Sequence, residues 1–153
     1  MIMEKTPLSG RSLEKDVFIN ATPERVFQAL TEPAELERWF VAKAEVDVRP
    51  GGTIRFEWGP GVFNVGKILV LDPPHCLSYS WEVQTPSPTT VTFALTAEHD
   101  GTRLHVINTG FGEGEDWDRY YDLRNNGWNV HLTNLTTWLE TGFAEPHRPR
   151  PSQ

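Results

Sequence analysis

Hydrophobic and polar positions follow two periods along the chain, and the change of period predicts where helices and strands lie. Residues 17–19 form a short apolar run typical of a strand. A helix is predicted over 23–30, because Thr22 can cap its first turn, Pro23 suits its first position and its apolar residues recur at helical spacing. The same signals predict a second short helix over 33–40.

From residue 43 onward, apolar and polar residues alternate, which is the pattern of half-buried strands. The predicted strands cover 44–48, 54–58, 62–71, 77–81, 91–95 and 104–106. Short segments rich in Gly, Pro and Asp separate most of them, so consecutive strands should pair as an antiparallel meander. One face of this sheet is expected to be apolar and covered.

A long helix over 116–141 is the predicted cover. Its apolar residues recur every three or four positions, and Gly142 can end it. Asn125-Asn126-Gly127 are poor helix formers, so we expect a kink or a break there. The acidic residues near its start are best explained by the favourable interaction of carboxylates with the positive end of a helix dipole.

Length and composition predict one folded domain. The chain has 153 residues, of which 38% are hydrophobic and 23% are charged, as in ordinary globular proteins. We expect an α+β domain over 13–143, a flexible N-terminal segment over 1–12 and a flexible proline-rich tail over 144–153.

The formal charge of −7 argues against binding to nucleic acids or anionic membrane surfaces, which are normally recognised by clustered Lys and Arg. Cys76 is the only cysteine, so it has no partner for an internal disulfide, and we expect a buried, inert thiol. No signal peptide or membrane-spanning run is recognisable, which favours a cytoplasmic location.

Several short motifs occur in an order that resembles a known superfamily. They are Ile19-Asn20-Ala21-Thr22-Pro23-Glu24-Arg25-Val26-Phe27, Arg49-Pro50-Gly51-Gly52, Asp72-Pro73-Pro74 with Tyr79-Ser80-Trp81, Thr102-Arg103-Leu104, and Gly127-Trp128. Together they resemble the START-like or SRPBCC superfamily, and more narrowly the family named after the C-terminal domain of the activator of Hsp90 ATPase. The resemblance implies a helix-grip fold, in which a curved antiparallel sheet wraps around a long C-terminal helix and two short helices follow the first strand. It also implies a cavity for small molecules.

Common catalytic motifs are missing from the sequence. It has no Gly-rich phosphate loop, no paired histidines of the zinc-protease type and no nucleophile elbow, so we assign no catalytic residue, metal or cofactor. An enzyme would need a titratable group inside the cavity, and His131 and Arg124 are the inward candidates. In the family that the chain resembles, the position of Asn108 often carries histidine, so a role for an imidazole there cannot be carried over.

Aromatic residues supply the remaining functional signal. The chain has six Trp and eight Phe, and many of them fall on faces expected to point inward. Such rings form either a solid core or the wall of a small-molecule site. The predicted ligand-binding residues are Trp39, Phe56, Trp58, Tyr79, Trp81, Phe93, Asn108, Trp128 and Leu132. Of these, Asn108 and Tyr79 would orient a polar group of the ligand, and Trp128→Ala should weaken binding without unfolding the domain.

The favoured function is binding of a small apolar or amphipathic ligand between the sheet and the last helix. A protein-interaction module acting with an Hsp90-type chaperone is a second hypothesis. An enzyme of the cyclase or hydrolase kind is a third, and the lack of motifs favours binding over catalysis. Exposed edge strands leave pairing into a homodimer open.

Overall fold

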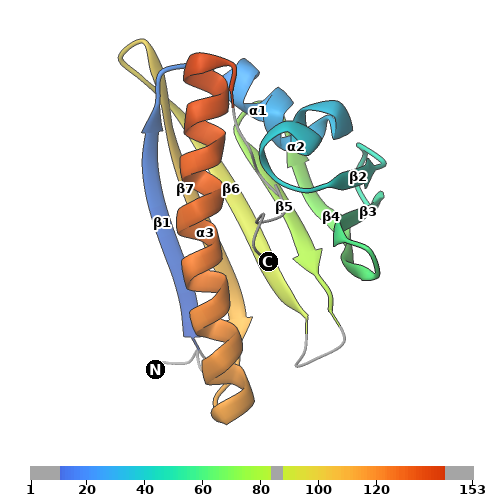
Figure 1. Cartoon of the computed structure of the whole chain (residues 1–153). Helices are drawn as coiled ribbons and strands as arrows, with labels where there is room; N and C mark the ends of the chain where they lie inside the picture. Colours follow the sequence, from blue (N-terminus) through green and yellow to red (C-terminus); the bar gives the residue numbers. More distant parts are fainter. Residues whose placement is uncertain (1–10, 84–87, 144–153) are drawn as a thin grey trace.

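The computed structural model of the protein describes residues 11–83 and 88–143. In chain order, the elements are β1 (Arg11–Ile19), α1 (Pro23–Thr31), α2 (Pro33–Trp39), β2 (Lys43–Val46), β3 (Thr53–Gly59), β4 (Val62–Asp72), β5 (Cys76–Trp81), β6 (Thr89–Glu98), β7 (Gly101–Phe111) and α3 (Glu115–Thr141). The strands form one antiparallel sheet in the order β1-β7-β6-β5-β4-β3-β2 (Figure 1). The predicted α+β helix-grip fold is therefore confirmed.

The first helix starts as its sequence predicts. Thr22 has extended backbone angles, and its Oγ1 accepts a hydrogen bond of 3.2 Å from the Arg25 N–H. Pro23 occupies the first helical position, where a missing N–H costs no helical hydrogen bond. The indole N–H of Trp39 in α2 donates to the Ala29 carbonyl at 2.9 Å, which fixes the two short helices against each other. Both lie at one end of the sheet (Figure 1).

Strand β1 is longer than its apolar run predicts. It begins at Arg11, and its register pairs Leu13 with Asn108 and Ile19 with Thr102 of β7. Arg11 and Ser12, which we placed in the flexible N-terminal segment, therefore belong to the sheet. The tail predicted over 144–153 lies outside the described residues.

Helix α3 runs without interruption from Glu115 to Thr141, so the predicted break at Asn125-Asn126-Gly127 is wrong. Contacts with β1 hold the helix along its length. They are Arg11 Nη1 to an Asp118 carboxylate oxygen at 2.8 Å, Tyr121 O–H to the Ser12 carbonyl at 3.1 Å, Lys15 Nζ to Asn125 Oδ1 at 2.6 Å, and Asn20 N–H to Glu140 Oε2 at 2.8 Å. We call this set the β1–α3 seam. Tertiary contacts at Asn125 thus outweigh its low helix propensity.

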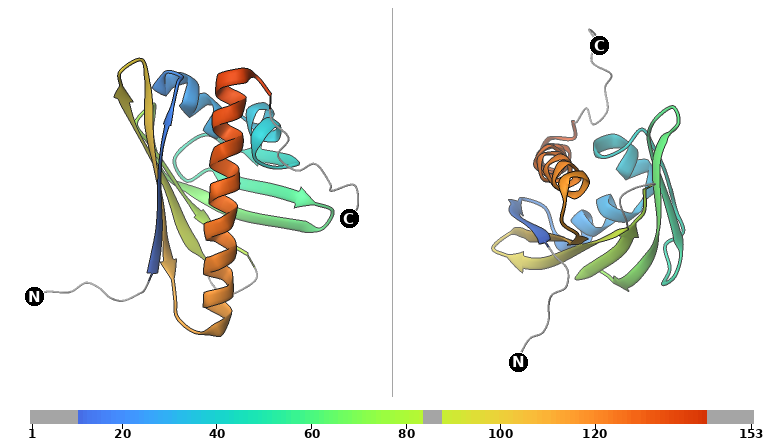
Figure 2. Two further views of the ribbon diagram at one scale, coloured as in Figure 1. Left: turned by 60° about the vertical axis from the view of Figure 1, so that its left-hand side comes forward. Right: turned by 90° about the horizontal axis from the view of Figure 1, so that it is seen from below.

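The sheet curves around α3, as the view from below shows (Figure 2). Gly66 in β4 lies at a close approach to β5, since a Cβ added there would meet the Ser80 carbonyl oxygen. The β4–β5 register also shifts between Ile68 and Val70. Glycines and bulges let strands bend and cross closely. The β3–β4 hairpin consequently turns away from the rest of the sheet and extends beside α3 (Figure 2).

Candidate functional site

Nine rings fill the space between the sheet and α3. We call them the ring cluster: Trp39, Phe40, Phe56, Trp58, Tyr79, Trp81, Phe93, Trp128 and His131. Phe40 lies at its centre, with ring centroids 4.7 Å from Trp39, 5.1 Å from Trp58 and 6.0 Å from Trp128. Sequence reasoning did not include Phe40 among the site residues, although its helical spacing next to Trp39 indicated an inward position.

Some of the predicted ligand-binding residues are packed inside the ring cluster, and others line a pocket or a groove. Five of them are buried in the ring cluster and are not part of the lining of the hollow beside it: Trp39, Phe56, Tyr79, Phe93 and Trp128. Trp58 and Trp81 belong to the cluster and also line a pocket. Leu132 lines a different groove. The rings therefore supply both of the expected features, a solid core and one wall of a hollow.

Asn108 is satisfied within the protein. Its side chain is 1% exposed, its Nδ2 donates to the Thr90 carbonyl at 3.0 Å, and its Oδ1 accepts from the Trp128 indole at 3.2 Å. These bonds fix the Trp128 ring against β7.

Tyr79 is buried, and burial raises the pKa of its phenol, which therefore stays neutral at physiological pH.

The hollow beside the ring cluster, which we call the aromatic pocket, has a volume of about 310 Å³. Its lining comes from the β3–β4 hairpin, from β5 and the residues after it, and from α3: Trp58, Val62, Phe63, Asn64, Trp81, Val83, Tyr120, Leu123, Arg124, Gly127 and His131. The walls are mainly aromatic and aliphatic, which is typical of small-molecule sites.

Exposed apolar side chains surround the pocket. Val62, Phe63 and Leu123 are 60%, 46% and 67% exposed and belong to its lining. The Arg55 guanidinium lies 4.2 Å from the centre of the Phe63 ring and also pairs with Glu57. Apolar residues gathered at a concave site indicate a place where a ligand or partner is bound.

The polar residues of this pocket were not among the predicted ligand-binding residues; they are Asn64, Tyr120, Arg124 and His131. Asn64 lies on the inward face of β4, is 1% exposed, and accepts a hydrogen bond from the Trp58 indole at 2.7 Å. Arg124 lies on α3, is 7% exposed, and stacks over the Trp81 ring at 3.9 Å. The signal for Arg124 was its position, because it stands four residues from Tyr120 and from Trp128 on the apolar stripe of the helix.

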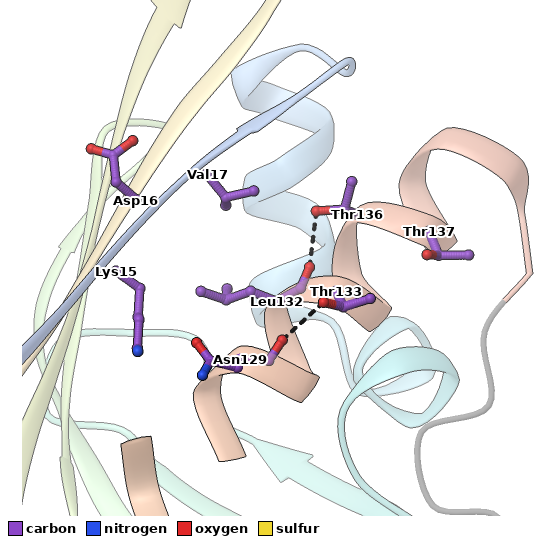
Figure 3. Close-up of a pocket in the computed structure, with 8 residues that line it drawn as sticks. All are labelled: Lys15, Asp16, Val17, Asn129, Leu132, Thr133, Thr136 and Thr137. Carbon is purple, nitrogen blue, oxygen red and sulfur yellow. Dashed lines mark hydrogen bonds between the residues drawn. The ribbon is translucent and has the colours of Figure 1, made fainter. Parts of the chain in front are cut away.

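A second hollow, the β1–α3 groove, has a volume of about 370 Å³ and a more polar lining (Figure 3). The hydroxyls of Thr133 and Thr136 point back to helix carbonyls, as the dashed lines show. Lys15 donates to Asn125, and Asp16 accepts from Arg103. Because these polar groups already have partners within the protein, the groove offers a ligand less than the aromatic pocket does.

Other candidate chemistry is placed as follows. His105 faces outward toward Asp16 and Glu14, whereas His131 lies in the ring cluster. Cys76 is only half-buried, so the expectation of a buried thiol is wrong, although burial and Asp72 raise its pKa.

Within residues 11–83 and 88–143, no group of three His, Cys, Asp or Glu residues could hold a metal ion. No helix in this part of the chain has the length and apolar character needed to cross a membrane.

Solved structures with the same fold include several bacterial proteins. Protein MLL2253 from Mesorhizobium loti is 28% identical, with a TM-score of 0.78 over 85% of this chain and 97% of its own. Aha1 from Colwellia psychrerythraea, described as a dimer, is 24% identical, with a TM-score of 0.78 over 87% of this chain and 98% of its own. CalU16 from Micromonospora echinospora is 25% identical, with a TM-score of 0.72 over 86% of this chain and 77% of its own.

No curated protein sequence matches the chain. A family model does match, namely the one for activator of Hsp90 ATPase homolog 1-like proteins, and the match covers residues 20–140. These residues run from the turn before α1 almost to the end of α3 and include every residue that lines the aromatic pocket. The chain therefore belongs to the family of activator of Hsp90 ATPase homolog 1-like proteins.

Proposed function

We propose that the protein binds a small, largely apolar ligand in the aromatic pocket. The observation that carries this proposal is the coincidence of a hollow of about 310 Å³ with aromatic walls and exposed apolar residues around it. Trp58 and Trp81 contribute indole rings to the lining, and such rings pack well against planar apolar ligands. Removing the apolar surface of such a ligand from water would supply most of the binding free energy.

Substitutions at Gly127 can test the pocket, because this residue of α3 lines the wall without a side chain. A Cβ added there would lie 3.6 Å from His131 Nε2 and 3.9 Å from Arg124 Nη1, which are ordinary contact distances. Gly127→Ala should therefore fold normally and gain about 0.5–1 kcal/mol from helix propensity. A longer side chain at this position would extend into the hollow.

We expect the neutral probe N-phenyl-1-naphthylamine to bind saturably and to quench tryptophan emission. Gly127→Leu should weaken this binding at least tenfold, whereas Gly127→Ala should keep it within threefold. Fluorescence titration measures the affinities, and circular dichroism verifies that both variants are folded. Absence of saturable binding to the unmodified protein, or equal binding by a folded Gly127→Leu variant, would contradict the proposal.

A further inference from the structure

Arg124 is a buried cation, and two of its three guanidinium nitrogens have no hydrogen-bond partner in the described chain. Its side chain is 7% exposed, and both Nε and Nη2 are buried without a hydrogen-bond partner among the residues that the structure describes. No carboxylate in the described ranges forms an ion pair with it. Buried arginines are normally paired, since an isolated charge loses its hydration without compensation.

The contacts that do hold Arg124 are aromatic. Its guanidinium lies 3.9 Å from the centre of the Trp81 ring and 5.4 Å from that of Trp128. Burial lowers the pKa of Arg124 to about 10, while the nearby phenols of Tyr120 and Tyr79 act in the opposite direction. The side chain is therefore still protonated at pH 7, and stacking on two indoles recovers only part of its lost hydration.

No carboxylate of the aromatic pocket is available to pair with Arg124. Its lining contains no Asp or Glu, and none of residues 84–87 is acidic. The Asn64 Nδ2 is a second buried donor without a partner in the described chain, since Trp58 occupies its Oδ1. The chain carries a formal charge of −7, yet the lining of this pocket contains a buried cation and no carboxylate.

We propose that the ligand of the aromatic pocket is an aromatic carboxylic acid, whose carboxylate pairs with the Arg124 guanidinium while its ring lies among the aromatic side chains. This inference rests on the proposed function. A planar carboxylate matches two adjacent N–H groups of a guanidinium. Arg124 and Gly127 both line the pocket, and Nη1 is 3.9 Å from the position that a Cβ on Gly127 would take. One buried cation neutralises a monoanion, whereas a dianion would enter apolar walls with uncompensated charge.

A matched pair of probes separates the charge from the ring. The acid 2-naphthoate and the neutral amide 2-naphthamide share one ring system and nearly the same shape. At pH 7.5 we expect the unmodified protein to bind 2-naphthoate at least tenfold more tightly than 2-naphthamide, by titration calorimetry or tryptophan quenching. Arg124→Met should remove this preference and leave the affinity for 2-naphthamide within threefold.

Two further variants keep the test specific. Arg124→Lys retains the charge without the planar fork and should retain part of the preference. Arg119→Met removes an exposed arginine of the same helix, which pairs with Asp116, and should retain all of it. Thermal melts verify that each variant is folded.

The possible results distinguish the two proposals. Equal binding of both probes to the unmodified protein, or a preference that survives in Arg124→Met, would overturn the carboxylate inference and leave the proposed function intact. If neither of these probes nor N-phenyl-1-naphthylamine binds saturably, the proposed function fails as well.

Discussion

Replacing Trp128 with alanine is expected to lower the free energy of unfolding by about 3–5 kcal/mol, the usual cost of removing a buried tryptophan. The side chain is fully buried and contacts Phe40, Trp81 and Phe93. The substitution would leave a large cavity at the centre of the ring cluster. It would also leave the buried Oδ1 of Asn108 without its indole donor. Urea unfolding measures the effect.

Trp138 provides the control on the same helix. It is partly buried, its indole donates to Glu35 Oε1 at 2.8 Å, and Arg38 lies over its ring. Trp138→Ala should cost clearly less than Trp128→Ala, because fewer buried contacts are lost. A loss below about 1.5 kcal/mol for Trp128→Ala, well under the usual range, would show that the cluster is loosely packed. The sequence-based expectation was that Trp128→Ala weakens ligand binding without unfolding the domain, and the burial of Trp128 adds the prediction of a large loss of stability.

Replacing Arg124 with methionine is expected to raise the free energy of unfolding of the unliganded protein by about 1–4 kcal/mol, the gain seen where buried ion pairs are replaced by well-packed apolar side chains. A pKa of about 10 in the folded state corresponds to a destabilisation of roughly 3 kcal/mol. Methionine has a similar length and can keep the contact with the Trp81 ring. Denaturant unfolding at pH 7 is the measurement, and Arg119→Met should change stability by less than about 0.5 kcal/mol, as exposed substitutions usually do.

The pH dependence of this gain has a definite sign. The pKa of Arg124 is lower in the folded protein than in the unfolded chain, so the unfolded chain binds the proton more tightly. The destabilisation is complete below pH 10 and is relieved as the pH rises above 10. The stability difference between Arg124→Met and the unmodified protein should therefore be constant from pH 6 to 9 and should narrow above pH 10. A variant that is less stable than the unmodified protein at pH 7 would show that stacking outweighs the cost of burial.

Most of the fold was predictable because its signals are local. Thr22 and Pro23 specify the start of α1, and the alternation of apolar residues locates β3, β5 and β6. The predictions of secondary structure were wrong where long-range contacts determine whether a residue belongs to a strand or a helix. Arg11 is polar, and only pairing with β7 shows that it belongs to a strand. Asn125 has low helix propensity, but its contact with Lys15 holds it within α3.

The candidate site was less predictable for a physical reason. Alternation shows that the side chains of Phe56, Trp58 and Tyr79 point inward, but it does not show whether neighbouring atoms fill the space in front of them. The aromatic pocket depends on how far the β3–β4 hairpin stands from α3, which no local pattern encodes. Arg124 was named from the sequence as an inward titratable candidate for an enzyme but not as a ligand-binding residue, although a charged residue rarely occupies a core position without a role.

The β1–α3 seam fixes α3 on one side only. Polar contacts hold one side of the helix at intervals from Asp118 to Glu140. On the opposite side, the β3–β4 hairpin faces the helix across the aromatic pocket. If the pocket binds a ligand as proposed, a larger or smaller ligand would displace the β3–β4 hairpin while the helix keeps its attachment. Selectivity for ligand size would then depend on the hairpin, and the position of the proposed charged anchor would depend on the helix.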